Sequence, residues 1–582
     1  MLIARRLYVY FIAVVGLAMA AAGVAHLLAL GSARVYQALG GAATQQSSES
    51  VRRDLSLYVA LVIVALPVWL LHWWLAERAR HRTDPDGERE RASSIRALYL
   101  TFVLAVTFVV IFNSCIDLII RLLAVFFRPP VSYEDPRGIW LPIAELLVAL
   151  IVHVYHVRIR LRDERGGPLE GPSNWLPRLY VYGAAFTGAM LFLFSFTDLI
   201  RLVVDVVFGS NLSQIGGRWW ADPLTTHTAP ALVGLAIWGL FWSFSLRTLR
   251  RSDWLGDSER RASLRWLYLY AIVFIGVLFT IIDINSSLVA LLRLILSVPR
   301  NVGQESSTRA ILDPLLQTVP FVAVWLYHRF VVLGADSAQA RTPGAESVRR
   351  LYTYLVACLW LALAGFGSAA VLSILIDLLL GGSRTQSVSS LVWRSDFARF
   401  SAYVLVGVAA WLWQWREAQR RAADDVRTER VATTRRIYLY LTLAATLVAL
   451  LISLALIVYR VISVVLGVHA GSGFASAMSR PLGVVIIAGA LFAYHLTVLR
   501  RDLALLAETQ SGTLTVSLTL TLPRGADIDA TVSTLREQLP EGYALALSRG
   551  ATQTVQLSTA VERPDSDDAQ AAIVGVPGAV AK

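Results

Sequence analysis

Apolar stretches of 20 residues or more recur along this chain to about residue 508. Examples are residues 98–120 and 351–380, and a stretch of that length matches the roughly 30 Å hydrocarbon core of a bilayer. The mean hydropathy of +0.58 and a charged fraction of only 16% agree with this interpretation, because water-soluble chains carry more charge. The sequence therefore predicts an all-α polytopic membrane protein.

A tract of Arg, then Leu or Ile, then Tyr opens six successive modules. Its tyrosines are Tyr8, Tyr99, Tyr180, Tyr268, Tyr352 and Tyr438, at spacings of 91, 81, 88, 84 and 86 residues. Each module closes with a second apolar span that ends in aromatic residues or His. The regular spacing predicts six tandem two-helix hairpins, each with the longer helix first, and about 12 transmembrane helices.

The module boundaries follow from these openings and closings. We predict hairpin repeats at residues 1–90, 91–172, 173–259, 260–344, 345–431 and 432–508. From residue 509 the pattern changes, because 513–522 alternates polar and apolar residues, 527–539 has helical periodicity, and 543–548 and 554–561 suit short strands. Residues 509–562 are thus expected to form a small cytosolic β-α-β-β domain, and 563–582 a disordered tail.

The formal charge of +12 points to membrane topology rather than to a nucleic-acid partner, because most Arg residues flank apolar spans. The side that holds the module junctions carries 32 Arg, against 16 for the loops and helix ends inside the modules. Both termini are therefore expected in the cytoplasm. All but one of the 53 basic residues are Arg, which favours a GC-rich bacterial source and an inner-membrane location.

The repeated residues resemble a known family. The Arg-Arg-Leu-Tyr-x-Tyr opening and the Trp-Leu-Leu-His-Trp closing of the first module are similar to the uncharacterised bacterial membrane domain catalogued as domain of unknown function 5671. All six modules, residues 1 to about 508, look like copies of it. The family has no established activity, so the resemblance implies fold and location only.

The Tyr and Trp residues at the helix ends are interpreted as an interfacial aromatic belt, with a series of binding sites for anionic lipid headgroups as the alternative. Four histidines occupy one repeat position: His72, His156, His328 and His495. For these, hydrogen bonding at the helix end is favoured over metal binding, which would require the four side chains to converge.

Ionisable residues in membrane helices are candidates for binding sites or pathways by default. Asp117 with Arg121 and Asp198 with Arg201 have the i, i+4 and i, i+3 spacings of ion pairs on one helix. They lie about 27 Å along the helix from the repeat tyrosine, so boundary ion pairs are the favoured interpretation. They remain the candidate binding residues; no catalytic motif is present, and we expect no metal and no cofactor.

The sequence favours a non-enzymatic sensor, scaffold or assembly factor that presents its cytosolic domain to an unknown protein partner. The alternative is a transporter or channel with a path between the repeats. A membrane enzyme acting on lipid is the third possibility. The lipid bilayer itself is the one partner that composition requires.

Overall fold

The structure is a computed structural model. It describes residues 2–40, 48–82, 84–129, 138–165, 169–209, 217–298, 306–333, 342–380, 390–467, 474–511, 514–519, 528–538, 543–549 and 555–561. The predicted disordered tail at 563–582 lies outside these residues. The chain divides into two compact units, one of residues 1–352 with 394–402 and one of residues 353–393 with 403–582. Each is described by itself.

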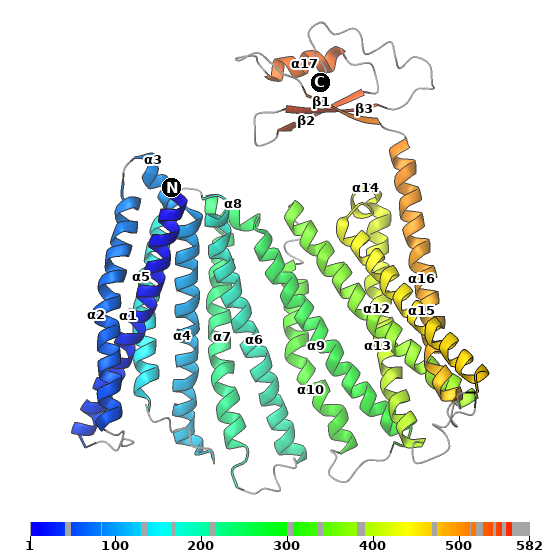
Figure 1. Cartoon of the computed structure of the whole chain (residues 1–582), viewed down its shortest axis with the longest axis horizontal. Coiled ribbons are helices and arrows are strands. Elements are labelled where there is room, and N and C mark those ends of the chain that lie inside the picture. The colour runs from blue at the N-terminus through cyan, green and yellow to red at the C-terminus, as the bar shows by residue number, and fades with distance from the viewer. Residues whose placement is uncertain are drawn as a thin grey trace. The chain divides into compact units, whose positions relative to one another are not determined.

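Twelve long helices form six successive hairpins (Figure 1). The hairpins are α1 (Leu2–Ala38) with α2 (Ser48–Arg80), α4 (Ser94–Phe127) with α5 (Trp140–Arg165), α6 (Pro172–Phe208) with α7 (Ala221–Leu249), α9 (Ser263–Ile295) with α10 (Ser307–Leu326), α12 (Pro343–Leu379) with α13 (Ser390–Asp424), and α15 (Thr433–Val465) with α16 (Phe474–Ser511). Among the described residues, ten helices are long and apolar enough to cross a membrane; α6 and α13 complete the hairpins. The chain is thus a helical membrane protein.

Small residues set the spacing within hairpins. A Cβ added at Gly234 of α7 would lie 2.5 Å from the backbone nitrogen of Phe192 on α6, and one at Gly188 would lie 2.6 Å from that of Trp238. Only glycine fits at such a distance, so the two backbones are in direct contact there. A Cβ added at Gly407 of α13 would likewise lie 2.7 Å from the backbone nitrogen of Ala364 on α12.

Consecutive hairpins pair into four-helix bundles. The first bundle is α1, α2, α4 and α5; the second is α6, α7, α9 and α10; the third is α12, α13, α15 and α16. Each has its own core of buried aromatic and aliphatic residues, centred on Tyr99, Tyr268 and Tyr438 respectively. The first two bundles touch through α4, where the Phe108 ring packs edge-on against Tyr180 and Phe241.

A short helix joins the two hairpins of each bundle: α3 (Pro85–Arg91), α8 (Trp254–Arg260) and α14 (Val426–Glu429). Each follows an Asp whose carboxylate accepts a backbone N–H of the first turn, namely Asp84, Asp253 and Asp425. Such a cap satisfies a donor that the helix leaves unpaired. We call the end of the bundles that carries these helices the junction side.

The second helix of the fourth hairpin ends irregularly. After Leu326 the chain continues as a π-helix, η2 (Tyr327–Val332), which holds more residues per turn than an α-helix. No other π-helix is present in the described part of the chain.

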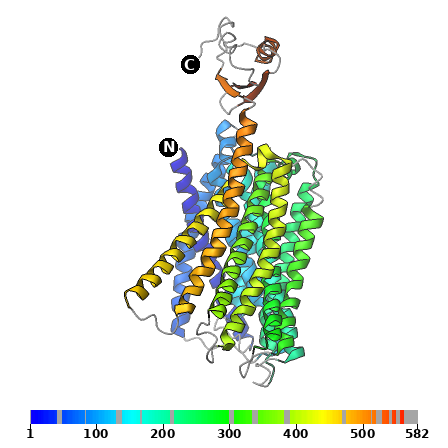
Figure 2. The same cartoon turned by 90° about the vertical axis from the view of Figure 1, so that its right-hand side faces the viewer.

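The last hairpin differs from the rest. The expected longer first helix is found in the other five, whereas here α16 has 38 residues and α15 has 33. Figure 2 draws α16 as one unbroken helix that leads toward the C-terminal segment. At about 1.5 Å per residue it is some 57 Å long, well beyond the hydrocarbon core.

Beyond α16 the structure has β1 (Leu514–Thr519), α17 (Ile528–Gln538), β2 (Tyr543–Arg549) and β3 (Val555–Val561). The strands form one antiparallel sheet in the order β1-β3-β2. Val561 is opposite both Leu514 and Tyr543, so β3 occupies the centre.

Candidate functional site

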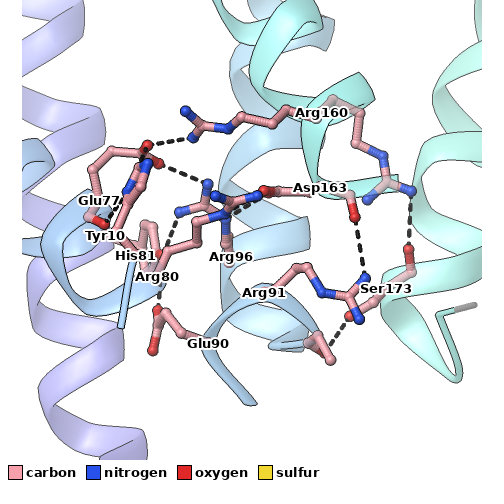
Figure 3. Close-up of polar contacts among 12 residues, drawn as sticks. Tyr10, Glu77, Arg80, His81, Glu90, Arg91, Arg96, Arg160, Asp163 and Ser173 are labelled. Carbon is pink, nitrogen blue, oxygen red and sulfur yellow. Dashed lines mark hydrogen bonds and ion pairs between the residues drawn. The ribbon is translucent and has the colours of Figure 1, made fainter. Parts of the chain in front are cut away.

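A buried arginine joins all four helices of the first bundle near its junction side. Arg96 of α4 is 1% exposed and donates to Oδ2 of Asp163 on α5 at 2.7 Å and to Oε1 of Glu77 on α2 at 2.7 Å. It also contacts the hydroxyl of Tyr10 on α1 at 3.3 Å. In Figure 3 its guanidinium lies between the two carboxylates. One side chain therefore fixes the positions of three neighbouring helices.

Further charged groups surround this arginine. Asp163 also accepts from Arg80 at 3.1 Å, and Glu77 from Arg162. Tyr10 donates to Glu90 of α3 at 2.9 Å, and Arg6 donates to the other oxygen of Glu90 at 2.6 Å. Each carboxylate thus meets at least one guanidinium, as buried charges require.

The third bundle repeats this arrangement. Arg435, 0% exposed, donates to Asp502 at 2.6 Å and to Oε1 of Gln419 at 3.0 Å, and it contacts the Tyr354 hydroxyl at 3.2 Å. Asp502 also pairs with Arg430 at 2.5 Å. Gln419 takes the position of Glu77, so this copy has one carboxylate fewer around its arginine.

The second bundle keeps part of the arrangement. Arg265 is 3% exposed, and Tyr182 donates to Glu259, which also accepts from Arg178 at 2.7 Å. Leu246 stands at the position of Glu77 and Gln419, four residues after the buried Trp242. The counterpart of Asp163 falls after η2, outside the described residues.

An aromatic layer lies directly beneath each arginine. In the first bundle Trp73 stacks on Tyr99 with ring centroids 5.2 Å apart, and the Arg96 guanidinium lies 5.6 Å from the Trp73 ring centroid, a cation–π contact. Tyr99 and Nε2 of His156 are 3.2 Å apart. Tyr438 and His495 are separated by the same 3.2 Å in the third bundle.

The histidines have one role. Nδ1 of each hydrogen-bonds to the carbonyl four residues earlier, at 2.7–2.9 Å, in His72, His156, His328 and His495. Hydrogen bonding agrees with the expectation, but it occurs within the helices rather than at their ends, since His156 lies nine residues and His495 16 residues before the last residue of its helix. Because a carbonyl only accepts, Nδ1 carries the proton, and in His156 and His495 Nε2 is left to accept from tyrosine.

The interpretation of all repeat tyrosines as an interfacial belt is wrong for half of them. Tyr8 is 60% exposed, but Tyr99, Tyr268 and Tyr438 are 2–3% exposed. The reason is that a hairpin alone does not determine which face is buried. When two hairpins pair, the even-numbered hairpin buries the first tyrosine of its opening tract, as in Tyr99. The odd-numbered hairpin buries the second tyrosine of its tract, as in Tyr10.

Outside the membrane spans, the junction helices show one clear electrostatic effect. Arg251 hydrogen-bonds to Asp253, with 3.0 Å between Nε and Oδ2. This contact, helped by the N–H of Gly256, holds the pKa of the Asp253 carboxyl below its ordinary value. The acid that caps α8 is thus kept ionised.

The four residues that sequence analysis selected lie elsewhere. Arg121 donates to Asp117 at 2.9 Å, so the predicted i, i+4 pair forms. Asp117 and Arg121 lie about 32 and 38 Å along α4 from Arg96, at the end opposite the junction side. Asp198 lies 3.9 Å from Arg201 and 3.5 Å from His227, while Arg201 donates to Gln317 at 3.0 Å. The first pair is thus far from the Arg96 cluster, whereas Arg201 of the second pair reaches the buried Gln317 of α10.

Sequence reasoning missed the buried arginines because it compared single hairpins. A signal exists at twice that period: Arg96, Arg265 and Arg435 are 169 and 170 residues apart, and Tyr10, Tyr182 and Tyr354 are 172 apart. Glu90, Glu259 and Glu429 repeat at 169 and 170. No group of three or more potential metal ligands is present among the described residues.

Comparison with known families gives the same period. A family model described as "Domain of unknown function (DUF5671)" matches residues 6–155, 178–346 and 350–490. Each match takes in the two hairpins of one bundle, which refines the expected six copies to three. No curated protein and no solved structure matches the chain.

Proposed function

Because the chain belongs to the family described as Domain of unknown function (DUF5671), whose role is not known, we propose a function from its own architecture. We propose that the bundles act as a membrane platform, of which the third bundle holds the C-terminal segment beside the bilayer and presents it to a protein partner. The bundles supply anchoring and rigidity. The C-terminal β-α-β-β segment supplies recognition.

One observation carries this proposal. Helix α16 extends without a break from Phe474 in the third bundle to Ser511, and β1 begins at Leu514. A continuous helix transmits position and rotation, whereas a flexible linker would uncouple the two parts. The paired charges of the first and third bundles support the same role, because a hydrogen-bonded polar cluster favours a single rigid arrangement.

The distribution of Arg supports the orientation. With 32 Arg on the junction side and 16 opposite, that side would face the cytoplasm of a bacterial cell and the C-terminal segment with it. Reporter fusions after Arg501 test this. Activity of a periplasmic reporter only would contradict it.

The coupling is tested by inserting a flexible Gly-Ser segment after Leu506. We expect the full-length protein to remain folded and membrane-bound but to lose its cross-links to a partner, as it would after deletion of residues 509–582. The same insertion between Ala43 and Thr44 serves as the control. Unchanged cross-linking after both the insertion and the deletion would refute the platform role.

A second candidate is a solute pathway through the second bundle. Polar groups on all four of its helices gather away from the junction side, including Asp198, His227, Asp283 and Gln317. Oδ2 of Asp283 is buried and has no hydrogen-bond partner among the described residues, which suits a group that binds a cation or proton. Loss of solute or ion flux in Asp283→Asn vesicles, with normal folding, would favour it over the platform.

A further inference from the structure

We propose that a cavity between α8 and the start of α6 binds the phosphate of an anionic membrane lipid. Its volume is about 720 Å³, within the roughly 300–1,000 Å³ of small-molecule sites. Trp254 and Arg261 line it on one side, and Asn174 and Trp175 on the other. The site does not depend on the platform role, since it concerns the first structural unit alone.

The cavity lies at headgroup depth. It sits where α6 begins and between the end of α7 at Leu249 and the start of α9 at Ser263. At the ends of membrane spans a side chain meets phosphates rather than acyl chains. Trp175 is 45% exposed there, and with Trp254 it gives the cavity two of the amphipathic rings that favour this depth.

One helical face supplies the polar groups. Trp254 and Ser258 of α8 and its C-cap residue Arg261 are spaced i, i+4 and i+7, so they lie on one side of the helix. The helix is held firmly, because Arg178 donates to Ser258 Oγ at 2.9 Å and a Cβ at Gly256 would lie 2.1 Å from the carbonyl oxygen of Arg251. The face is therefore presented in a fixed orientation.

The charges that line the cavity indicate which class of ligand it binds. Arg178 is paired with Glu259 at 2.7 Å, and Asp257 is paired with Arg260 at 2.5 Å, so these charges cancel. Arg261 is exposed and makes no ion pair with any residue of the described chain. The cavity thus has one uncompensated cation beside two tryptophan rings and the mutually hydrogen-bonded Asn174 and Ser258, and such a cation attracts an anionic headgroup.

The site is specific to the second bundle. At the positions of Trp254 and Arg261, the first bundle has Pro85 and Ala92, and the third has Val426 and Val431. The short helix and its Asp cap recur in all three bundles, but the aromatic and cationic face does not. A structural role shared by the three bundles does not account for it.

The experiment uses the full-length protein and native mass spectrometry after titration with phosphatidylglycerol or phosphatidylcholine. We expect preferential retention of phosphatidylglycerol, with about five- to tenfold weaker binding in Arg261→Gln and recovery in Arg261→Lys. Arg420→Gln, which removes another exposed arginine on the junction side, is the matched control and should bind like the unaltered protein. Thermal unfolding of each variant checks that the fold is intact.

Three results would overturn the proposal. Equal retention of the two lipids would remove the charge selectivity. Equal weakening in Arg261→Gln and Arg420→Gln would indicate diffuse attraction to a basic surface rather than a site. The third result combines displacement of bound lipid by millimolar inorganic phosphate with protection of the unaltered protein from unfolding by phosphate but not by phosphatidylglycerol. It would assign the cavity to a soluble phosphate compound instead.

Discussion

Arg96 and Asp163 are hydrogen-bonded at 2.7 Å, and each residue is only 1% exposed. Both belong to the second hairpin, and Arg96 also contacts Glu77 and Tyr10 of the first hairpin. The pair is thus the centre of a bundle rather than a feature of one helix. Removing either charge leaves the other in a place where water cannot compensate it.

We predict that Arg96→Met lowers the free energy of unfolding of the full chain by about 3–5 kcal/mol, because Asp163 and Glu77 lose their partner. Thermal or denaturant unfolding in detergent measures it. Arg121→Met is the matched control, since its partner Asp117 is 41% exposed and the change should be within about 1 kcal/mol. Equal losses in the two variants would contradict the distinction.

Helix spacing in the second bundle gives another prediction. Gly234→Ala should destabilise the protein by about 1–3 kcal/mol, because the added methyl group would overlap the backbone of α6. Gly239 lies five residues further along α7 and has no atom within 4 Å of an added Cβ. Gly239→Ala should be neutral or stabilising by up to about 1 kcal/mol, as expected for an exposed helical glycine. The opposite order in unfolding experiments would show the packing to be different.

The third bundle has unfilled space where the second has aromatic rings. Phe279 stacks on Phe321 with centroids 4.8 Å apart, and the matching positions of the third bundle are Ala449 and Ala488, which line a groove of about 320 Å³. Replacing both alanines by Phe should raise the free energy of unfolding by about 0.5–2 kcal/mol. Ala357→Phe, at a fully buried position in the same bundle, should lower it by about 1–3 kcal/mol. Destabilisation by the double replacement would mean that the groove is not available to side chains.

The cap of α8 should depend on pH. The pKa of the Asp253 carboxyl is lowered in the folded protein by Arg251, so its contribution is present above the ordinary value of about 3.9 and is lost as pH falls through the lower, folded pKa. Hydrogen exchange of residues 254–260 should therefore become faster, relative to an Asp253→Asn variant, only at acidic pH. Asparagine also caps helices but does not titrate. If the ratio of the exchange rates of the unaltered protein and the Asp253→Asn variant stayed constant down to acidic pH, the effect would be excluded.

Periodicity in the sequence predicted the hairpins, since apolar length and repeated ends depend only on local chemistry. The helical membrane part followed from it. The buried role of Tyr99 did not, because hydrophobic periodicity is the same for a helix that faces lipid and one that faces another hairpin. Arg96 was hidden for a similar reason: an arginine at a helix end is typical of the membrane boundary, and only the partners contributed by a distant segment reveal it as core.

Each bundle needs residues from both of its hairpins, and this requirement restricts how such a gene can change length. The odd-numbered hairpin contributes Tyr10, Tyr182 or Tyr354, and the even-numbered one contributes the arginine and the histidine. Loss of one hairpin would remove the partners of half of a cluster and leave a charged side chain against lipid. Duplications and deletions that preserve a folded product must therefore come in steps of about 170 residues, two hairpins at a time.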